Sequence, residues 1–216
     1  MTELEGLTEF NALEAQCGGC VACKLTPTRK NVVFGVGDPN ANLMIIGEGP
    51  GEDEDRTGIP FVGRAGQLLD QILAAAQIPR ASVYIANMVK CRPPGNRNPE
   101  SDEIASCEHW LLDQIRLIRP QIIVTLGNVP TQWALQSTIG ITRARGQWGT
   151  FKKLNMPIPI LPMFHPAYLL RNPIRDVGGP KWLTWQDVKA LKVELENLGP
   201  KPDLKLQLEP EQTGLF

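Results

Sequence analysis

Short β-branched apolar runs alternate with segments of helical periodicity along most of this chain of 216 residues. The apolar runs span residues 43–47, 83–86, 122–127 and 158–164, and the helical segments span residues 65–76, 99–118, 129–136 and 182–198. Strands separated by helices favour parallel pairing. We predict a three-layer α/β fold in which helices flank a central, mostly parallel four-stranded sheet. Because Pro159 and Pro162 lie in the last run, we expect that strand to be interrupted or at an edge.

The domain organisation follows from the same pattern. We expect residues 1–198 to form a single domain and residues 199–216 to form an extension, because the tail contains several prolines and lacks periodicity. No apolar run approaches the roughly 18 residues of a membrane span. The acidic start lacks the basic and apolar regions of a signal peptide, so we expect a cytoplasmic location. No sequence feature indicates oligomerisation, so a monomer is the default expectation.

The net charge of −1 excludes a bulk basic excess, but the charges are unevenly distributed. Between Gln114 and Arg175 there are eight basic residues and no acidic residue. Such a segment produces a local positive field of the kind that a nucleic-acid backbone requires. A chance polar face on a nearly neutral protein explains the same distribution equally well.

A polar residue directly follows each predicted strand: Glu48, Asn87, Asn128 and His165. In open α/β sheets, ligands bind beyond the carboxyl ends of the strands. These side chains therefore predict a pocket, although Asn128 is equally well explained as the cap of the helix that it precedes.

The loop over residues 47–63 is rich in glycine and acidic residues. Alternating Gly47, Gly49 and Gly51 indicate a backbone that approaches another group closely. The loop lacks the dinucleotide fingerprint and the lysine and hydroxyl residue of a Walker A motif, which excludes an NTPase. Phe61 in this loop is either a plug against the core or a stacking platform for a planar ligand.

Five cysteines suggest metal ligation, because disulfides are rare in an intracellular chain. Cys17, Cys20 and Cys23 form a ladder with two residues between successive members, and Cys91 and Cys107 are 16 positions apart. The ladder favours an iron–sulfur cluster, while zinc and unrelated thiols remain alternatives. One cysteine is left over if the site takes four.

Four motifs in this order are similar to those of the family 4 uracil-DNA glycosylases, the iron–sulfur type of bacteria and archaea. They are GEGPGEDE at 47–54, PFVGRAGQLLD at 60–70, NMVKCRPPGNRNP at 87–99 and HPAYLLR at 165–171. The resemblance runs from about residue 20 to about residue 185. It implies an α/β enzyme of DNA repair that flips uracil out of DNA and hydrolyses its N-glycosidic bond, leaving an abasic site.

The resemblance also implies roles for individual residues. Glu48 and His165 would be catalytic, and the residues that bind the base would be Glu48, Gly49, Glu54, Phe61, Asn87 and His165. A [4Fe–4S] cluster would be held by Cys20, Cys23, Cys91 and Cys107, with Cys17 spare. The DNA contacts would come from Tyr168, Leu169, Leu170, Arg171, Arg92 and Arg97.

The chemistry of these residue types agrees with such roles. A carboxamide such as that of Asn87 can accept from uracil N3–H and donate to O4, which cytosine cannot match. A neutral His165 could donate to the departing base, and Glu48 could stabilise a cationic sugar and orient water. The apolar residues 168–170 are explained either as core or as a wedge that enters the base stack.

Two alternatives belong to other classes of protein. A non-catalytic iron–sulfur DNA-binding module would share the cysteines and the basic segment, and a zinc-stabilised nucleotide-binding protein would be colourless.

The C-terminal residues Gln212, Leu215 and Phe216 have the spacing of peptides that bind the bacterial sliding clamp, which predicts this clamp as a partner. These expectations together place the protein at the nucleoid.

Overall fold

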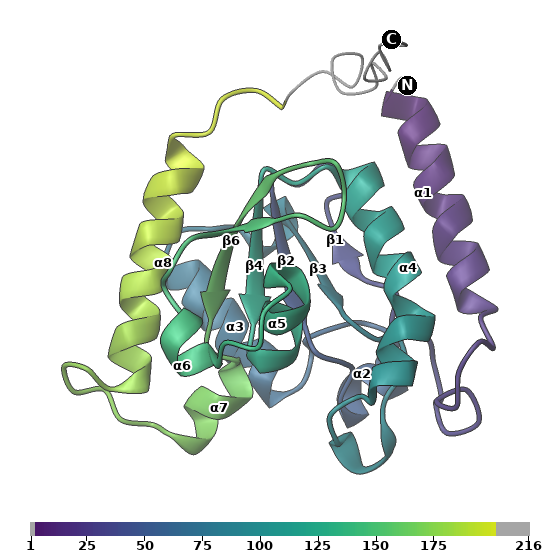
Figure 1. Cartoon of the computed structure of the whole chain (residues 1–216), viewed down its shortest axis with the longest axis horizontal. Helices are drawn as coiled ribbons and strands as arrows, with labels where there is room; N and C mark the ends of the chain where they lie inside the picture. Colours follow the sequence, from purple (N-terminus) through teal and green to yellow (C-terminus); the bar gives the residue numbers. More distant parts are fainter. Residues whose placement is uncertain (1–2, 202–216) are drawn as a thin grey trace, which may run out of the picture.

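The computed structural model describes residues 3–201, which form a sheet covered by helices on both faces (Figure 1). Its strand order is β1-β3-β2-β4-β6-β5. The strands are β1 Val36–Gly37, β2 Leu43–Gly47, β3 Val83–Asn87, β4 Ile122–Leu126, β5 Gly149–Phe151 and β6 Ile158–Met163.

The four predicted strands are confirmed as the parallel centre of the sheet, β3-β2-β4-β6. The predicted strand number of four was too low, because β1 and β5 add short antiparallel edges. The expectation of an interrupted or edge position for β6 was also wrong, since β6 is continuous and pairs with both β4 and β5. Pro159 is tolerated there because it faces β5, which is only three residues long and requires few hydrogen bonds, and Pro162 lies past the end of the β5 pairing.

The helices include all four that the sequence predicts, with ends shifted by one or two residues. The elements are α1 Glu3–Gly18, α2 Glu52–Thr57, α3 Arg64–Ala75, α4 Ser101–Ile118, α5 Asn128–Leu135, α6 Ile141–Ala144, α7 Pro166–Arg171 and α8 Pro180–Glu196. Short 3₁₀ helices span Arg80–Ser82 and Pro94–Asn96. The sequence did not predict α1, α2, α6 or α7, of which the last three are too short to show periodicity.

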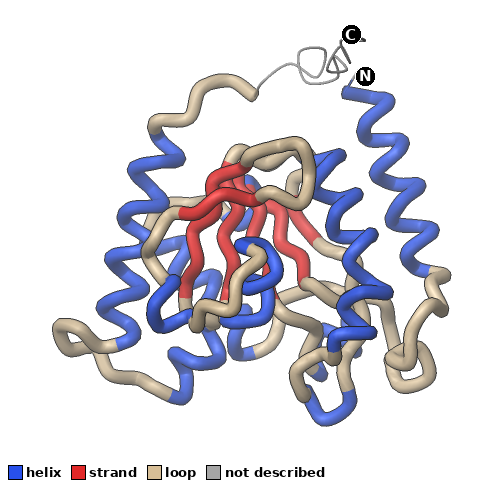
Figure 2. The backbone as a smooth tube through the Cα atoms, viewed as in Figure 1, coloured by secondary structure: helices blue, strands red, loops and turns tan. Residues whose placement is uncertain are grey.

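The strands lie in the middle of the molecule with helices on both sides (Figure 2). Alternate residues of the strands enter two separate apolar layers, as the pleat requires. In β2, Met44 and Ile46 pack in the layer that contains residues of α1, α4 and α5. Leu43 and Ile45 pack in the opposite layer, with residues of α3 and α8. Both faces of the parallel strands are therefore buried, which explains their uninterrupted apolar sequences.

The carboxyl ends of β2, β3, β4 and β6 lie at one edge of the sheet, where α2, α7 and the connecting loops gather (Figure 1). At the other end, the Lys201 ammonium donates to the carbonyl oxygens of Ala41 and Ile118, both at 2.9 Å. In the part of the chain that the structure describes, no helix is long and apolar enough to cross a membrane. The clamp-like peptide at Gln212, Leu215 and Phe216 lies outside the described residues.

Candidate active site

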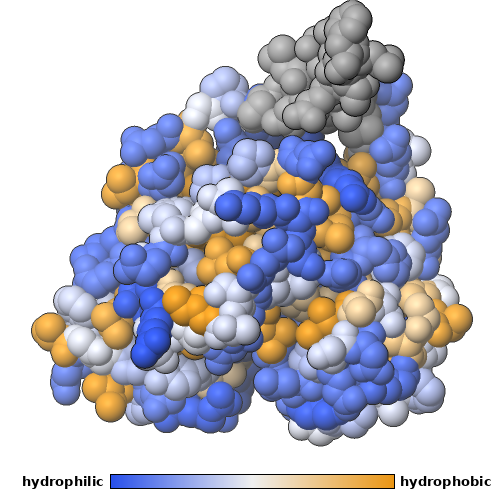
Figure 3. Space-filling view, viewed as in Figure 1, coloured by the Kyte–Doolittle hydropathy of each residue, from blue (hydrophilic) through white to orange (hydrophobic). Residues whose placement is uncertain are grey.

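A cavity of about 630 Å³ opens at the carboxyl ends of the parallel strands. Figure 3 shows the corresponding lower edge of the molecule as a notch between two largely hydrophilic lobes. The predicted pocket residues that line the cavity are Glu48, Gly49, Glu54, Phe61, Asn87, Asn128 and His165. The structure therefore brings together side chains from four strand ends, as the sequence pattern predicted.

Asn87 forms the last position of β3, where it pairs in register with Gly47 of β2. Its side chain is buried, and its Oδ1 atom has no hydrogen-bond partner. A Cβ atom on Gly47 would lie 2.4 Å from this oxygen and 2.6 Å from the Phe61 ring. Gly47 thus allows the carboxamide and the aromatic ring to meet, and a buried acceptor without a donor indicates a site for a ligand N–H group.

Phe61 is held in a conformation that its residue type disfavours, with a φ of 54°. Such a left-handed backbone costs a non-glycine residue roughly 1–2 kcal/mol. The Arg80 guanidinium donates to the carbonyl oxygens of Pro60 at 3.0 Å and Phe61 at 3.2 Å, and it also pairs with Asp70. The loop is therefore fixed from its carbonyl side, which presents the Phe61 ring as a wall of the cavity.

Glu54 fixes the same loop from its amide side. Its Oε1 atom accepts from the backbone N–H groups of Val62 at 2.9 Å and Gly63 at 2.8 Å. Its Oε2 atom accepts from the N–H of Gly51 at 3.0 Å. The carboxylate thus ties the two glycine-rich segments of the cavity wall together, a bracing role that the sequence did not reveal.

His165 precedes α7 and caps it. Its Nδ1 atom accepts from the backbone N–H of Ala167 at 3.1 Å, so the neutral imidazole carries its proton on Nε2. Burial lowers the pKa of His165 to about 4, with a smaller contribution from the positive charge of Arg171. The ring lies 5.8 Å from that of Phe61, centroid to centroid, and is tilted by 33°. His165 is therefore a neutral hydrogen-bond donor at neutral pH.

Glu48 is half-buried at the end of β2, and burial raises the pKa of its carboxyl group. A partly desolvated carboxylate is a stronger base and acts strongly on a positive charge that develops nearby. Asn128 has a structural role, since its Oδ1 atom accepts from the N–H of Ile141 at 2.7 Å. Of the four polar residues at strand ends, the other three remain available for a ligand.

The cysteines divide between two environments. Cys91 and Cys107 are buried in one small apolar cluster, with Cys23 packed against it. Cys17 instead is fully buried in the main core near the end of α1, while Cys20 is half-buried in the loop that follows. Within residues 3–201, no three Cys, His, Asp or Glu side chains converge closely enough to hold a single metal ion.

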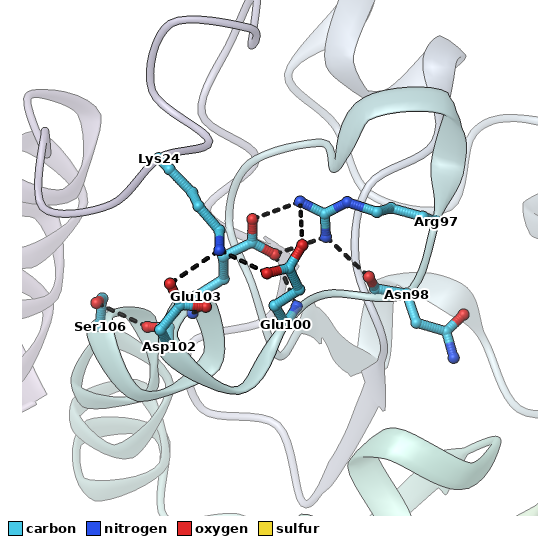
Figure 4. A network of polar contacts seen from close by, with 7 residues as sticks. All are labelled: Lys24, Arg97, Asn98, Glu100, Asp102, Glu103 and Ser106. Atoms are coloured by element: carbon cyan, nitrogen blue, oxygen red, sulfur yellow. Dashed lines mark hydrogen bonds and ion pairs between the residues drawn. The ribbon is translucent and has the colours of Figure 1, made fainter.

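A network of ion pairs fastens the cysteine segment to the start of α4 (Figure 4). Lys24, next to Cys23, pairs with Glu100 at 2.6 Å and with Asp102 at 2.9 Å. Arg97 holds the fully buried carboxylate of Glu103 through two hydrogen bonds of 2.6 and 2.8 Å. The network thus links the segment around Cys23 with the helix that carries Cys107.

The predicted DNA-contacting residues do not all lie at the surface. Leu169 is buried in the protein interior, whereas Tyr168 and Leu170 are exposed. Burial removes Leu169 from the proposed wedge and supports the core interpretation for that residue. Tyr168 and Arg171 line the cavity, so α7 presents an aromatic and a basic side chain at its rim.

The predicted phosphate-binding arginines of the 92–97 loop are already paired. Arg92 contacts Glu52 at 3.5 Å, and Arg97, which lines the cavity, holds Glu103. Three cations of the basic segment 114–175 also pair with carboxylates outside it: Arg116 with Asp113, Lys153 with Glu108 and Arg145 with Asp187. Counting charges along the sequence therefore overstated the local positive field.

Fold and site together define the class of the protein. The family model described as the uracil DNA glycosylase superfamily matches residues 34–189, which include every cavity-lining residue named above. The chain is 48% identical over 184 residues to the type-4 uracil-DNA glycosylase of Thermotoga maritima, covering 83% of this chain and 91% of that protein. Type-4 uracil-DNA glycosylases of Sulfurisphaera tokodaii and Saccharolobus solfataricus are both 45% identical, over 71% and 73% of this chain and 72% and 76% of theirs. The chain belongs to the type-4 uracil-DNA glycosylase family.

Proposed function

We propose that this protein excises uracil from DNA by hydrolysing the N-glycosidic bond. The observation that carries the proposal is the buried, unpaired Oδ1 atom of Asn87, which lies against an aromatic ring in an open cavity. A base inside a duplex is out of reach of such a cavity, so the target nucleotide must be flipped out. A non-catalytic DNA-binding module would not need this buried acceptor together with Glu48 and His165.

Phe61 and Asn87 provide recognition. Stacking on Phe61 replaces the contacts that the base loses on leaving the duplex and contributes about 1–3 kcal/mol. The Oδ1 atom of Asn87 accepts from uracil N3–H, and its amide nitrogen donates to O4. Cytosine presents the reverse pattern, which would leave buried polar groups unpaired and so reject it.

His165 and Glu48 provide the chemistry. As the bond breaks, the sugar becomes cationic and the uracil becomes an anion. The Nε2–H of neutral His165 donates to uracil O2 and stabilises this anion as its charge develops. Glu48 stabilises the cationic sugar and orients the attacking water. Glu54 supports both by bracing the loops that carry Gly51 and Phe61.

We further propose that Cys20, Cys23, Cys91 and Cys107 hold a [4Fe–4S] cluster. Two sulfur atoms already accept hydrogen bonds, Cys91 from the Arg29 guanidinium and Cys107 from the Lys90 amide, both at 3.3 Å. Such donors in an apolar shell are typical around iron–sulfur thiolates. The described cysteine side chains do not converge on one metal ion. This arrangement is compatible with a cluster of four irons, because each cysteine would bind a different iron. When bound, the cluster would fasten the N-terminal segment to α4.

The proposed DNA contacts are the exposed side chains on α7. Leu170 and Tyr168 are the candidates for an apolar wedge that fills the space of the flipped nucleotide, and Arg171 is the candidate for a phosphate. Arg97 and Arg92 could contact phosphates only by sharing their guanidinium groups with the carboxylates that already hold them.

An excision assay tests this function. The purified protein is incubated with an oligonucleotide that contains one uracil, and abasic sites are then cleaved with alkali. We expect cleavage at the uracil alone, while an otherwise identical oligonucleotide with thymine stays intact. Binding of the uracil oligonucleotide without cleavage would favour the non-catalytic DNA-binding module instead.

The terminal peptide points to a second partner. We propose that Gln212, Leu215 and Phe216 bind the sliding clamp, because they keep the spacing of clamp-binding peptides. Gel filtration of clamp mixed with full-length protein should show co-elution that is lost when residues 212–216 are deleted. Co-elution that survives the deletion would rule out this peptide as the contact.

A further inference from the structure

Lys90 is the largest charged side chain that the described core buries, with 1% of its surface exposed. Its ammonium donates to the Gln114 side-chain oxygen at 2.6 Å and to the backbone carbonyl of Asn87 at 3.1 Å. No carboxylate of the described chain forms an ion pair with it. Moving a lysine side chain out of water costs free energy, so the burial of Lys90 calls for an explanation beyond packing.

Gln114 in turn is anchored to the sheet and to the segment before it. Its amide nitrogen donates to the Phe34 carbonyl and to the Tyr84 hydroxyl, both at 3.0 Å. With the nitrogen engaged in this way, the oxygen of the carboxamide faces Lys90. A buried chain of hydrogen bonds therefore runs from Tyr84 through Gln114 and Lys90 to the peptide of Asn87.

This row of hydrogen bonds lies between the cavity and the cysteines. On the cavity side, the amides of Met88 and Val89 donate to the carbonyls of Gly47 at 3.0 Å and Glu48 at 3.3 Å. On the other side, the amide of Lys90 donates to the Cys107 sulfur at 3.3 Å, and Cys91 follows in the chain. The segment over residues 87–90 is thus held on one side by the end of β2 and on the other by Cys107, one of the proposed cluster ligands, and it leads directly into Cys91, another.

We propose that Lys90 is a positioning residue that fixes the Asn87 carboxamide for uracil and makes its position depend on the cysteine site. The proposal rests on the function proposed above. Asn87 must present two polar atoms to the base at once, so a small shift of its peptide weakens both hydrogen bonds. Lys90 holds that peptide, and through its own backbone it also contacts a cysteine ligand.

The test compares Lys90→Met with Lys201→Met. Lys201 is a matched control, since its ammonium also donates to two carbonyl oxygens, both of them in the backbone, but it lies at the opposite end of the sheet. The readouts are the inhibition constant of free uracil, the affinity for DNA with an abasic site, and the visible absorbance near ~400 nm of an iron–sulfur protein. Free uracil reports on the base-binding residues Asn87, Phe61 and His165, whereas abasic DNA reports on the rest of the surface.

We expect Lys90→Met to bind free uracil about tenfold more weakly, the effect of losing roughly one hydrogen bond. Its affinity for abasic DNA and its absorbance should stay within twofold of the unmodified protein, and Lys201→Met should match that protein in all three. If Lys90→Met does not fold, Gln114→Met removes the same support from the other side and should show the same selective loss. Unchanged uracil inhibition in the folded variant would overturn the proposal. An unmodified protein that releases no uracil would instead contradict the proposed function.

Discussion

Two substitutions of His165 distinguish the roles of its two hydrogen bonds. Its Nδ1 atom accepts from Ala167 N–H and caps α7, while Nε2–H is the donor proposed for the departing base. In His165→Asn, the side-chain oxygen can still cap the helix, because asparagine is among the best capping residues, but the catalytic donor is lost. In His165→Ala, both bonds are lost.

We expect single-turnover excision to fall by about 10²–10³-fold in both variants, the usual loss when one such donor is removed. The unfolding free energy should stay close to that of the unmodified protein in His165→Asn. It should fall by about 1 kcal/mol in His165→Ala because the cap is gone. Rates on a uracil oligonucleotide and urea unfolding curves measure the two effects.

The pH dependence of the unmodified protein provides an independent check. With a pKa of about 4, His165 is protonated in only about 0.1% of molecules at pH 7. Excision should therefore show no titration of His165 between pH 5 and 8. Because the unfolded state binds this proton near pH 6.5 and the folded state does not, the His165 contribution to stability decreases as the pH falls from about 6.5 toward 4. The neutral-donor role would be refuted if the excision rate fell above pH 6.5 with loss of a proton from His165. It would also be refuted if His165→Asn kept an excision rate within twofold of the unmodified protein.

Three further predictions concern the cavity and the cysteines. Asn87→Asp should lose uracil excision and shift the preference toward cytosine, since a protonated carboxyl matches the cytosine edge; an unchanged ratio of the two rates would contradict the assignment. Gly47→Ala should lower excision at least tenfold, because its Cβ atom would displace Asn87 or Phe61, whereas the control Gly140→Ala meets nothing within 4 Å and should keep the rate. Cys20→Ser should lose the absorbance near ~400 nm and Cys17→Ser should keep it, and the reverse result would exchange their roles.

The sequence predicted the parallel centre of the sheet because its strands are buried on both faces and read as continuous apolar runs. It could not predict β1 and β5, since strands of two and three residues have no measurable pattern. Helix α1 was missed because only a narrow stripe that includes Phe10, Leu13 and Cys17 is buried. The other face of this helix is exposed, so its apolar periodicity is weak.

The gathering of Glu48, Asn87 and His165 at one edge could be predicted because chain topology fixes where parallel strands end. The pairing of side chains from distant segments could not. Arg92 and Glu52 are 40 positions apart, and the sequence gives no sign that they pair. The same holds for Lys90 and Gln114, which are 24 positions apart. The sequence therefore predicted the residues that line the site, whereas the contacts that hold these residues in place could be found only in the structure.

A crystal structure of the protein with free uracil tests the proposed recognition of the base most directly. We expect the ring to stack on Phe61, N3–H and O4 to contact the two polar atoms of the Asn87 carboxamide, and the Nε2 atom of His165 to lie within hydrogen-bond distance of O2. A uracil that binds elsewhere, or that binds in this cavity without contacting Asn87, would contradict it.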